Sequence, residues 1–249
     1  CCEATVLRNE VIAPDIRLLT VVWPDRDHAP HAGQFFTLRS WGADEAPFLS
    51  RPISVHKWEP ETQTIEFLYQ VIGEGTHKIA QLKTGDTFQL TGPMGNGFDV
   101  ESLTKTYRKF AVVGGGIGTA PLLLVCKELC RAGVRPDLYV GFRDTSYGME
   151  SFVPWCHSIH LATDSGSEGH HGLVTDLLDV THYDIVLTCG PMVMMRGVAK
   201  LCAAAGVPCL ASLEKKMACG LGACLGCTCH TKIGPVTVCK DGPVFNAQE

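Results

Sequence analysis

The first part of the chain, from about residue 5 to residue 98, consists of short apolar segments separated by turn residues. β-Branched and aromatic residues fill the segments, and turns are marked at Pro24-Asp25, Ala32-Gly33, Thr84-Gly85-Asp86 and Gly92-Pro93. This pattern predicts strands at residues 4–7, 16–22, 35–38, 53–58, 64–71 and 87–91 and one helix at 76–81. Strands at this spacing predict a small antiparallel β-barrel.

From Lys109 onward, short and almost wholly apolar segments alternate with helical ones. Strands are predicted at residues 110–113, 138–142, 158–162, 184–188 and 209–212, and helices at 120–131, 174–178 and 191–204. This alternation is typical of a parallel sheet with helices packed on its faces. The predicted fold class is therefore multidomain: an antiparallel β-barrel followed by an α/β domain.

The residues after about Leu213 form short segments rich in glycine and cysteine. They contain too little apolar surface to fold by themselves, so a bound metal centre is expected to supply much of their stability. The predicted organisation is a β-barrel at 1–98, an α/β domain at 99–212 and a small metal-binding subdomain at 213–249.

Four cysteines in this last segment have the spacing of iron–sulfur ligands: Cys219, Cys224, Cys227 and Cys239. The spacing C-x4-C-x2-C, followed by a more distant cysteine, is the plant-type pattern for a [2Fe–2S] cluster. Cys229 also follows Cys224 after four residues, but Lys232 stands where the next ligand of that register would be. A zinc site is the alternative, although zinc ligands usually come as two short C-x2-C pairs.

Composition limits the function further. The chain has 249 residues, 45% of them hydrophobic and 19% charged, and a net charge of −5, so nothing favours nucleic acid as a partner. The apolar runs are too short to cross a membrane, and no secretion signal is expected at the N-terminus. Thirteen cysteines without a disulfide-like spacing favour a reducing, cytoplasmic location.

Two glycine-containing loops follow strands of the predicted parallel sheet. Gly114 to Gly118 lies between a strand and a helix, where backbone N–H groups can meet a pyrophosphate, although Pro121 replaces the last glycine of G-x-G-x-x-G. The second loop is Cys189-Gly190-Pro191. Both loops are expected at the carboxyl edge of the sheet, where open parallel sheets bind ligands. A simple tight turn at the first loop, and a small packed residue at Cys189, remain alternatives.

Two further phosphate-binding candidates lie in the barrel part. Arg51-Pro52-Ile53-Ser54 combines a guanidinium fork with a hydroxyl, both suited to a phosphate. Gly73-Glu74-Gly75-Thr76 precedes the predicted helix, so its backbone N–H groups are also available to an anion. Taken alone, the first motif is better described as an ordinary strand entry with an exposed arginine.

Together these motifs resemble the ferredoxin–NADP reductase superfamily, in which FAD lies on the barrel and a nicotinamide nucleotide on the second domain. The run Met217-Ala218-Cys219-Gly220-Leu221-Gly222-Ala223-Cys224, with residues 238–245 behind it, narrows the resemblance to the electron-transfer subunits of class B dihydroorotate dehydrogenases. The resemblance spans nearly the whole chain. It implies cofactor ligands as follows: Arg51, Pro52, Ile53, Ser54, Leu68, Tyr69, Gln70, Gly75 and Thr76 for FAD; Gly114, Gly115, Gly116, Gly118, Thr119, Gly190 and Pro191 for NAD, with Cys189 near the nicotinamide; and Cys219, Cys224, Cys227 and Cys239 for the [2Fe–2S] cluster.

The resemblance also implies a function in pyrimidine biosynthesis. Electrons from an FMN-containing dihydroorotate dehydrogenase subunit would pass through the cluster to FAD and then to NAD+, in a heterotetramer of two subunits of each kind. A catalytic (β/α)8 barrel takes about 250 residues, which this chain has no room for, so the partner must be another polypeptide. The alternatives are the small subunit of a sulfide dehydrogenase or of an NADH-dependent ferredoxin:NADP oxidoreductase, or a zinc-binding module without redox activity.

Overall fold

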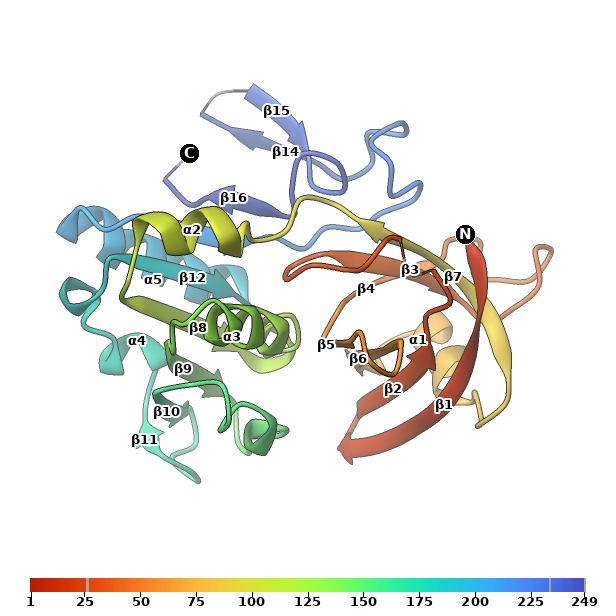
Figure 1. Cartoon of the computed structure of the whole chain (residues 1–249), viewed down its shortest axis with the longest axis horizontal. Helices are drawn as coiled ribbons and strands as arrows, with labels where there is room; N and C mark the ends of the chain where they lie inside the picture. Colours follow the sequence, from red (N-terminus) through yellow and green to blue (C-terminus); the bar gives the residue numbers. More distant parts are fainter. Residues whose placement is uncertain (26, 233, 249) are drawn as a thin grey trace. The chain divides into compact units, whose positions relative to one another are not determined.

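The computed structural model describes residues 1–25, 27–232 and 234–248, which form two compact units (Figure 1). The first unit comprises Cys1–Gly97 and Glu214–Pro243, and the second comprises Phe98–Leu213 and Val244–Glu249. Within the described residues, the helices are too short or too polar to cross a membrane.

The main sheet of the first unit is antiparallel, with the strand order β4-β3-β7-β1-β2-β6-β5. Its elements are β1 (Cys2–Ala13), β2 (Ile16–Val22), β3 (Phe35–Arg39), β4 (Arg51–Ser54), β5 (Lys57–Glu59), β6 (Thr64–Gln70) and β7 (Thr87–Met94), and the helix α1 (Glu74–Ala80) follows β6.

This sheet curls back on itself around an aromatic core. The rings of Phe36 on β3 and Phe67 on β6 lie 5.8 Å apart, although three strands separate β3 from β6 in the sheet. The edge strands β4 and β5 are joined by only Val55 and His56. Val55 donates its N–H to Gln34 before β3, and His56 donates to Glu66 on β6. The single strand predicted at 53–58 is therefore two strands at opposite ends of a curled sheet.

The second unit contains a parallel sheet with the order β11-β10-β9-β8-β12-β13-β16, in which only β16 runs antiparallel to its neighbour. Its strands are β8 (Phe110–Gly115), β9 (Asp137–Phe142), β10 (Ser158–Thr163), β11 (His170–His171), β12 (Ile185–Cys189), β13 (Cys209–Ser212) and β16 (Val244–Asn246). Its helices are α2 (Val100–Thr106), α3 (Leu122–Arg131), α4 (Val174–Leu177) and α5 (Met192–Ala205), with short 3₁₀ turns at Gly116–Thr119, Met149–Ser151 and Val180–His182.

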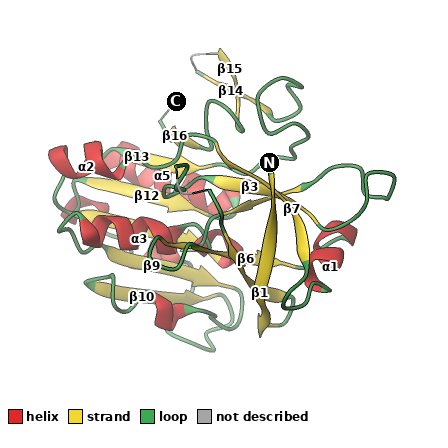
Figure 2. Ribbon diagram, turned by 45° about the vertical axis from the view of Figure 1, so that its right-hand side comes forward, coloured by secondary structure: helices red, strands yellow, loops and turns green. Residues whose placement is uncertain are grey.

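The central strands β8 and β12 are buried at every residue, as expected for parallel strands covered on both faces. The connection through α3 leads from β8 to β9, and the connection through α5 leads from β12 to β13 in the opposite direction along the sheet. Right-handed crossovers in opposite directions place the two helices on opposite faces of the sheet (Figure 2).

The structure differs most from the sequence prediction at strands and helices that depend on contacts with residues distant in the sequence. Strand β1 is much longer than the predicted 4–7, because it pairs with both β2 and β7. Helix α2 was not predicted; the side chain of Asp99 caps it by accepting the N–H of Ser102. The hairpin β14 (Thr228–Thr231) and β15 (Gly234–Thr237) was also missed.

The segment predicted as a separate subdomain, 213–249, is divided between the two units. Residues 214–243 cluster with the antiparallel sheet of the first unit, and β16 adds to β13 of the second unit. A segment this poor in apolar surface gains stability by attaching to larger neighbours, which explains the division.

One carboxylate stabilises the entry to the parallel sheet. Asp184 accepts the backbone N–H groups of Arg108 (2.8 Å) and Lys109 (2.9 Å), and these two bonds hold its pKa below the ordinary value. A lowered pKa in the folded state contributes stability above the unfolded pKa of about 3.9, and that contribution is lost as the pH falls through the folded value.

We therefore expect Asp184→Asn to lower the free energy of unfolding at pH 7 by about 1 kcal/mol or less, because the site is exposed. The difference between variant and wild type should shrink below about pH 4. Urea unfolding at several pH values measures it, with Glu150→Gln, an exposed side chain of the same unit, as control. A difference that stays constant down to pH 3 would contradict the assignment.

Candidate functional site

The four predicted cluster ligands lie in two pairs. The backbone N–H of Cys224 donates to Sγ of Cys219, and the backbone N–H of Cys239 donates to Sγ of Cys227 (both 3.4 Å). A [2Fe–2S] cluster distributes four thiolates over two irons, so two thiol pairs are the arrangement that it needs. The donor set therefore fits the cluster.

Backbone N–H groups surround these sulfurs. Each sulfur accepts at least one: Cys219 from Leu221 and Cys224 (both 3.4 Å), Cys224 from Gly226 (3.5 Å), Cys227 from Cys239 (3.4 Å) and Cys239 from Gly222 (3.1 Å). The bonds from Leu221 and Cys224 lower the pKa of Cys219 to about 6, whereas burial and the bond to Cys227 raise the pKa of Cys239 to about 11. The glycine-rich loop thus favours a thiolate at Cys219, as a metal ligand requires.

The fifth cysteine of the segment, Cys229, belongs to neither pair, although it lies close enough to Cys227 for the two thiols to interact electrostatically. Cys229 is on β14, opposite Val236 of β15, and burial raises its pKa. Throughout the described part of the chain, no group of three or more His, Cys, Asp or Glu side chains is arranged to hold a single metal ion. The four cysteines that form the two pairs are the four predicted as cluster ligands. Their role as ligands stays a prediction.

The cysteine loop is attached to the antiparallel sheet of the same unit. Asn96 donates its side-chain N–H to the carbonyls of Lys240 (2.9 Å) and Asp241 (3.3 Å), and its backbone N–H to Gly242 (2.6 Å). Near Cys219, a Cβ added to Gly220 would lie 2.6 Å from Sδ of Met94 on β7 and 3.7 Å from Cγ2 of Thr37 on β3. The loop of the first pair therefore packs directly on strands β3 and β7.

Asn96→Asp should loosen this attachment. The substitution keeps the shape of the side chain but removes both side-chain donors, each worth about 1 kcal/mol, and places a negative charge near two carbonyl oxygens. We expect the iron of the loaded protein to be lost to a chelator several-fold faster, as a loss of about 1–2 kcal/mol in the attachment implies. Thr62→Ala, an exposed substitution in the same unit, is the control, and an unchanged rate of iron loss would argue against the role of Asn96.

The two FAD motifs of the first unit come together although 23 residues separate Arg51 from Gly75 in sequence. Arg51 begins the edge strand β4, and Thr37 of β3 pairs with Pro52 beside it. A Cβ added to Gly75 would lie 3.0 Å from Cγ and 3.1 Å from Cζ of Arg51, so the guanidinium lies against the first turn of α1. An arginine fork and a helix N-terminus at one place are suited to a diphosphate. Through Thr37, the same strands also contact the cysteine loop.

The other predicted FAD residues of these two motifs differ in how accessible they are to a ligand. Ile53 and Ser54 continue the half-buried edge strand, where they are accessible to a ligand. The hydroxyl of Thr76 is engaged locally, since it donates to the carbonyl of Gly73 (2.9 Å) and accepts the N–H groups of Ile72 and Gly73. It shapes the turn before α1, and its backbone remains the group available to a phosphate.

Strand β6 presents its three predicted residues on two faces. The ring of Tyr69 is buried, its hydroxyl is 3.2 Å from Oδ1 of Asn9, and burial raises its pKa to about 12. Leu68 and Gln70 lie on the opposite face because side chains alternate along a strand. The side chain of Tyr69 therefore supports the sheet, and only Leu68 and Gln70 share a face on which a ring could lie.

The two glycine loops of the second unit pack against each other at the carboxyl edge of the parallel sheet. Cys189 at the end of β12 is the register partner of Gly114 on β8. A Cβ on Gly118 would lie 2.6 Å from the backbone nitrogen of Gly190 and 2.7 Å from the carbonyl oxygen of Cys189. A Cβ on Gly115 would lie 2.9 Å from Cδ of Pro191. The loops therefore form one continuous glycine-lined edge, the place where a pyrophosphate can approach backbone N–H groups.

Two residues of this edge have roles within the protein itself. The hydroxyl of Thr119 is buried and donates to the carbonyl of Gly116 (2.9 Å), so it closes the 3₁₀ turn. Cys189 is 1% exposed at the end of β12, between Gly114 of β8 and Ser212 of β13. Its proximity to a nicotinamide stays a prediction.

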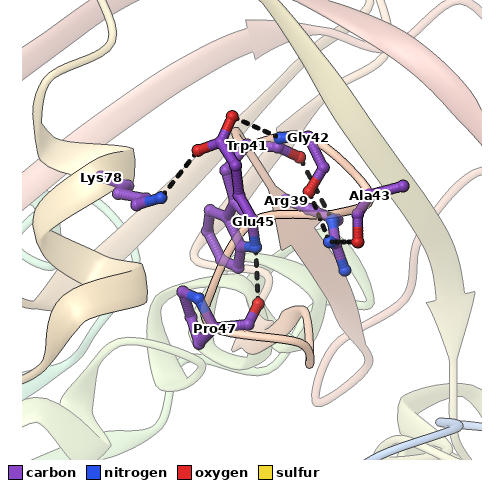
Figure 3. Close-up of polar contacts among 7 residues, drawn as sticks. All are labelled: Arg39, Trp41, Gly42, Ala43, Glu45, Pro47 and Lys78. Atoms are coloured by element: carbon purple, nitrogen blue, oxygen red, sulfur yellow. Dashed lines mark hydrogen bonds and ion pairs between the residues drawn. The ribbon is translucent and has the colours of Figure 1, made fainter.

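A third group of residues beside the FAD motifs was not predicted. Trp41 is buried in the loop after β3, and the cations Arg39, Arg51 and Lys78 lie around its ring. Figure 3 draws Trp41 with two of these cations, Arg39 and Lys78. Trp41 and Lys78 also line a pocket of about 540 Å³. A tryptophan within a polar segment, ten residues before the R-P-x-S motif, was the only signal of this group in the sequence.

Comparison with known proteins identifies the same combination of parts. A family model for the iron–sulfur cluster binding domain of dihydroorotate dehydrogenase B matches residues 214–249. The dihydroorotate dehydrogenase B (NAD(+)) electron transfer subunit of Clostridium acetobutylicum is 46% identical over 217 residues, 87% of this chain and 85% of the relative. The corresponding subunit of Caldanaerobacter subterraneus is 40% identical over 255 residues, 99% of this chain and 97% of the relative.

A solved structure agrees with the fold. The structure of an NADH-dependent reduced ferredoxin-NADP oxidoreductase, studied for flavin-based electron bifurcation, superposes with a TM-score of 0.85 at 27% identity and covers 100% of this chain and 90% of that chain. The predicted combination of an antiparallel sheet domain, a parallel α/β domain and an iron–sulfur segment is thereby confirmed. On its sequence, its fold and its cysteine segment, the chain belongs to the family of dihydroorotate dehydrogenase B (NAD(+)) electron transfer subunits.

Proposed function

We propose that this chain is the electron-transfer subunit of an NAD-dependent dihydroorotate dehydrogenase and carries electrons from a catalytic partner subunit to NAD+. The observation that carries the proposal is the 46% identity to a subunit of that name, together with the paired cysteines of its matched iron–sulfur segment. The bound groups supply the chemistry: FAD exchanges a hydride with the nicotinamide and single electrons with the [2Fe–2S] cluster.

The chain's own residues hold these groups in order. The four cysteines supply thiolates, and the glycine loop between them supplies N–H donors that stabilise negative charge. Arg51 and the first turn of α1 position a diphosphate on the strands that also contact the cysteine loop. The glycine edge of Gly114 to Gly118 and Gly190 accommodates the nicotinamide nucleotide.

The exposed side of the cysteine loop suits a partner subunit. Cys224 is exposed, and the apolar side chains that flank it, Leu221 and Leu225, are 68% and 64% exposed. Leu225 also has a positive φ of 57°, a backbone conformation that costs free energy outside glycine. An exposed apolar rim beside a redox centre is suited to a protein interface. We assign this rim to the FMN-containing catalytic subunit, in a heterotetramer with two subunits of each kind.

The state of the cysteines supports a proposal about the cellular compartment. None of the thirteen cysteines, all of which lie in described parts of the chain, forms a disulfide bond, and reduced cysteines are typical of proteins kept in a reducing compartment. We therefore place the complex in the cytoplasm.

Co-purification with the catalytic subunit tests the function. The two chains expressed together should reduce NAD+ when dihydroorotate is added, and the purified chain should contain FAD and two equivalents each of iron and sulfide. This chain alone should oxidise NADH with an artificial acceptor but form no orotate. Gel filtration with light scattering measures the number of subunits.

Two results would contradict the proposal. Orotate formation by this chain alone would contradict the need for a partner, and a colourless preparation loaded with zinc would favour the module without redox activity. The ferredoxin:NADP oxidoreductase alternative has less support, because that structure is only 27% identical to this chain. Reduction of NADP+ by reduced ferredoxin, with no response to dihydroorotate, would favour it instead.

A further inference from the structure

The loop that follows β3 is fastened by one arginine. Arg39 donates from Nε to the carbonyl of Trp41 (3.2 Å), from Nη2 to Gly42 (2.6 Å) and Ala43 (3.1 Å), and from Nη1 to Phe48 (2.7 Å). Figure 3 shows this guanidinium beside the carbonyls of Gly42 and Ala43. Four of the five N–H donors of Arg39 are thus bonded to carbonyls of the loop, so Arg39 holds the backbone of the loop.

A second set of contacts joins the same loop to helix α1. The indole N–H of Trp41 donates to the carbonyl of Pro47 (2.6 Å), and Nζ of Lys78 on α1 lies 2.9 Å from Oε2 of Glu45 (Figure 3). Glu45 also accepts the backbone N–H of Gly42, and the pKa of Glu45 is lowered, chiefly by the hydrogen bond from Lys78. The indole of Trp41, 8% exposed, is thereby fixed in one orientation.

Three cations lie within 6 Å of the centre of this ring. Cζ of Arg39 is at 5.6 Å, Cζ of Arg51 at 5.9 Å and Nζ of Lys78 at 5.9 Å. Arg39 is bonded to carbonyls and Lys78 to Glu45. Among the described residues, the hydrogen bonds of Arg51 come from Nη1, toward the carbonyls of Leu49 (2.8 Å) and Ser50 (3.5 Å). Its Nε lies against Gly75, and its Nη2 makes no hydrogen bond to the described residues.

From this arrangement we propose that Trp41 is a positioning residue for FAD. Its ring holds the guanidinium of Arg51 against the first turn of α1, with the fork directed at the flavin diphosphate, and Arg39 and the Glu45–Lys78 pair hold the ring in place. The ring acts through its negative face, which attracts a cation without occupying any of its N–H donors. Arg51 is thereby oriented before FAD arrives, and less conformational entropy is lost on binding. This inference rests on the proposed function, because it takes FAD as the ligand.

The test compares flavins that differ in phosphate content. The full-length chain, stripped of flavin, is titrated with FAD, FMN and riboflavin for wild type, Trp41→Leu, Trp41→Phe, Arg51→Met and the double variant. Trp41→Leu should weaken FAD and FMN by about tenfold each, as expected when a partly desolvated cation loses a tryptophan face. Riboflavin, which has no phosphate, should bind all variants equally well, and Trp41→Phe should restore most of the affinity. In the Arg51→Met background, Trp41→Leu should have no further effect.

The other possible results of these titrations would each contradict the inference or the proposed function. A loss of riboflavin affinity in Trp41→Leu equal to that of FAD, or additive losses in the double variant, would mean that Trp41 only supports the fold and would overturn the inference. A loss for FAD but not for FMN would instead assign Trp41 to the wall of the neighbouring pocket, around the adenosine, and would overturn it as well. Failure of the wild-type chain to bind FAD at all would overturn the proposed function first. Urea unfolding of each variant measures any general loss of stability separately.

Discussion

Cys224→Ala should abolish dihydroorotate-dependent reduction of NAD+ while the reaction of NADH with ferricyanide continues. Removing one of four thiolates leaves an iron without its full ligand set, and we expect the cluster to be lost or bound at least about a hundredfold more weakly. Cys224 lies on the exposed side of the loop, so its replacement leaves no buried cavity. The predicted FAD and NAD residues lie outside the cysteine loop, and we expect the reaction of NADH with ferricyanide to need only those. Iron and sulfide content, visible absorption and the two activities measure the outcome.

Cys229→Ala provides the matched control. This cysteine is part of the same segment, but it lies on β14 and belongs to neither of the two thiol pairs. Its replacement should leave the iron content, the sulfide content and both activities unchanged. If Cys229→Ala lost the cluster and Cys224→Ala retained it, the ligand register proposed from the spacing would be wrong.

Gly118→Ala should nearly eliminate NAD+ reduction and destabilise the second unit. The added methyl would lie 2.6 Å from the backbone nitrogen of Gly190 and 2.7 Å from the carbonyl oxygen of Cys189, and backbone atoms cannot turn away as a flexible side chain can. We expect the free energy of unfolding to fall by about 1–3 kcal/mol, as for overpacked sites. We expect kcat/KM for NAD+ to fall by about a hundredfold, because displacement of a binding loop by about 1 Å has effects of that size.

The glycine in α5 serves as the control for this substitution. A Cβ on Gly197 would approach only Cγ2 of Thr175, at an ordinary 3.4 Å, and alanine has a higher helix propensity than glycine. Gly197→Ala should therefore keep the activity and the stability, or raise the stability slightly.

Reduction of the bound FAD by dihydroorotate, measured with the partner subunit present, should survive in Gly118→Ala. Loss of that reaction too would mean that the substitution acts on the whole protein rather than on the nucleotide edge.

The fold was predictable wherever local pattern determines it. The strands β8 and β12, predicted at 110–113 and 184–188, are buried at every residue and carry a nearly continuous apolar sequence, so their place in a parallel sheet follows from the pattern. The segment 53–58 has the same local character throughout. It was predicted as one strand because nothing in it shows that Val55 and His56 bond to different strands of a curled sheet.

Some residues of the candidate site were likewise predictable from the sequence, and others were not. Cysteine spacing predicts a ligand set because the chain linking Cys219, Cys224 and Cys227 is too short to separate them, whereas Cys239 is brought back to Cys227 by the hairpin β14–β15. The FAD set was predicted by resemblance, and the structure separates its members: Arg51 meets Gly75, whereas the ring of Tyr69 turns into the core toward Asn9. Trp41 was missed, because its proximity to Arg51 and Lys78 depends on how a loop folds over a helix from elsewhere in the sequence.

The sequence by itself predicted most strands and helices of the two sheets, the spacing of the cysteines and the family resemblance, since these depend on residue type and short spacing. Only the tertiary structure decided which distant residues meet: Arg51 with Gly75, Gly118 with Gly190, and Asn96 with the chain after Cys239. The physical reason is that these contacts depend on packing between separate elements, whose free energy no local segment contains. For the same reason the cysteine segment, which the sequence presents as separate, packs on the antiparallel sheet through Met94, Asn96 and Thr37, and its last strand, β16, joins the parallel sheet.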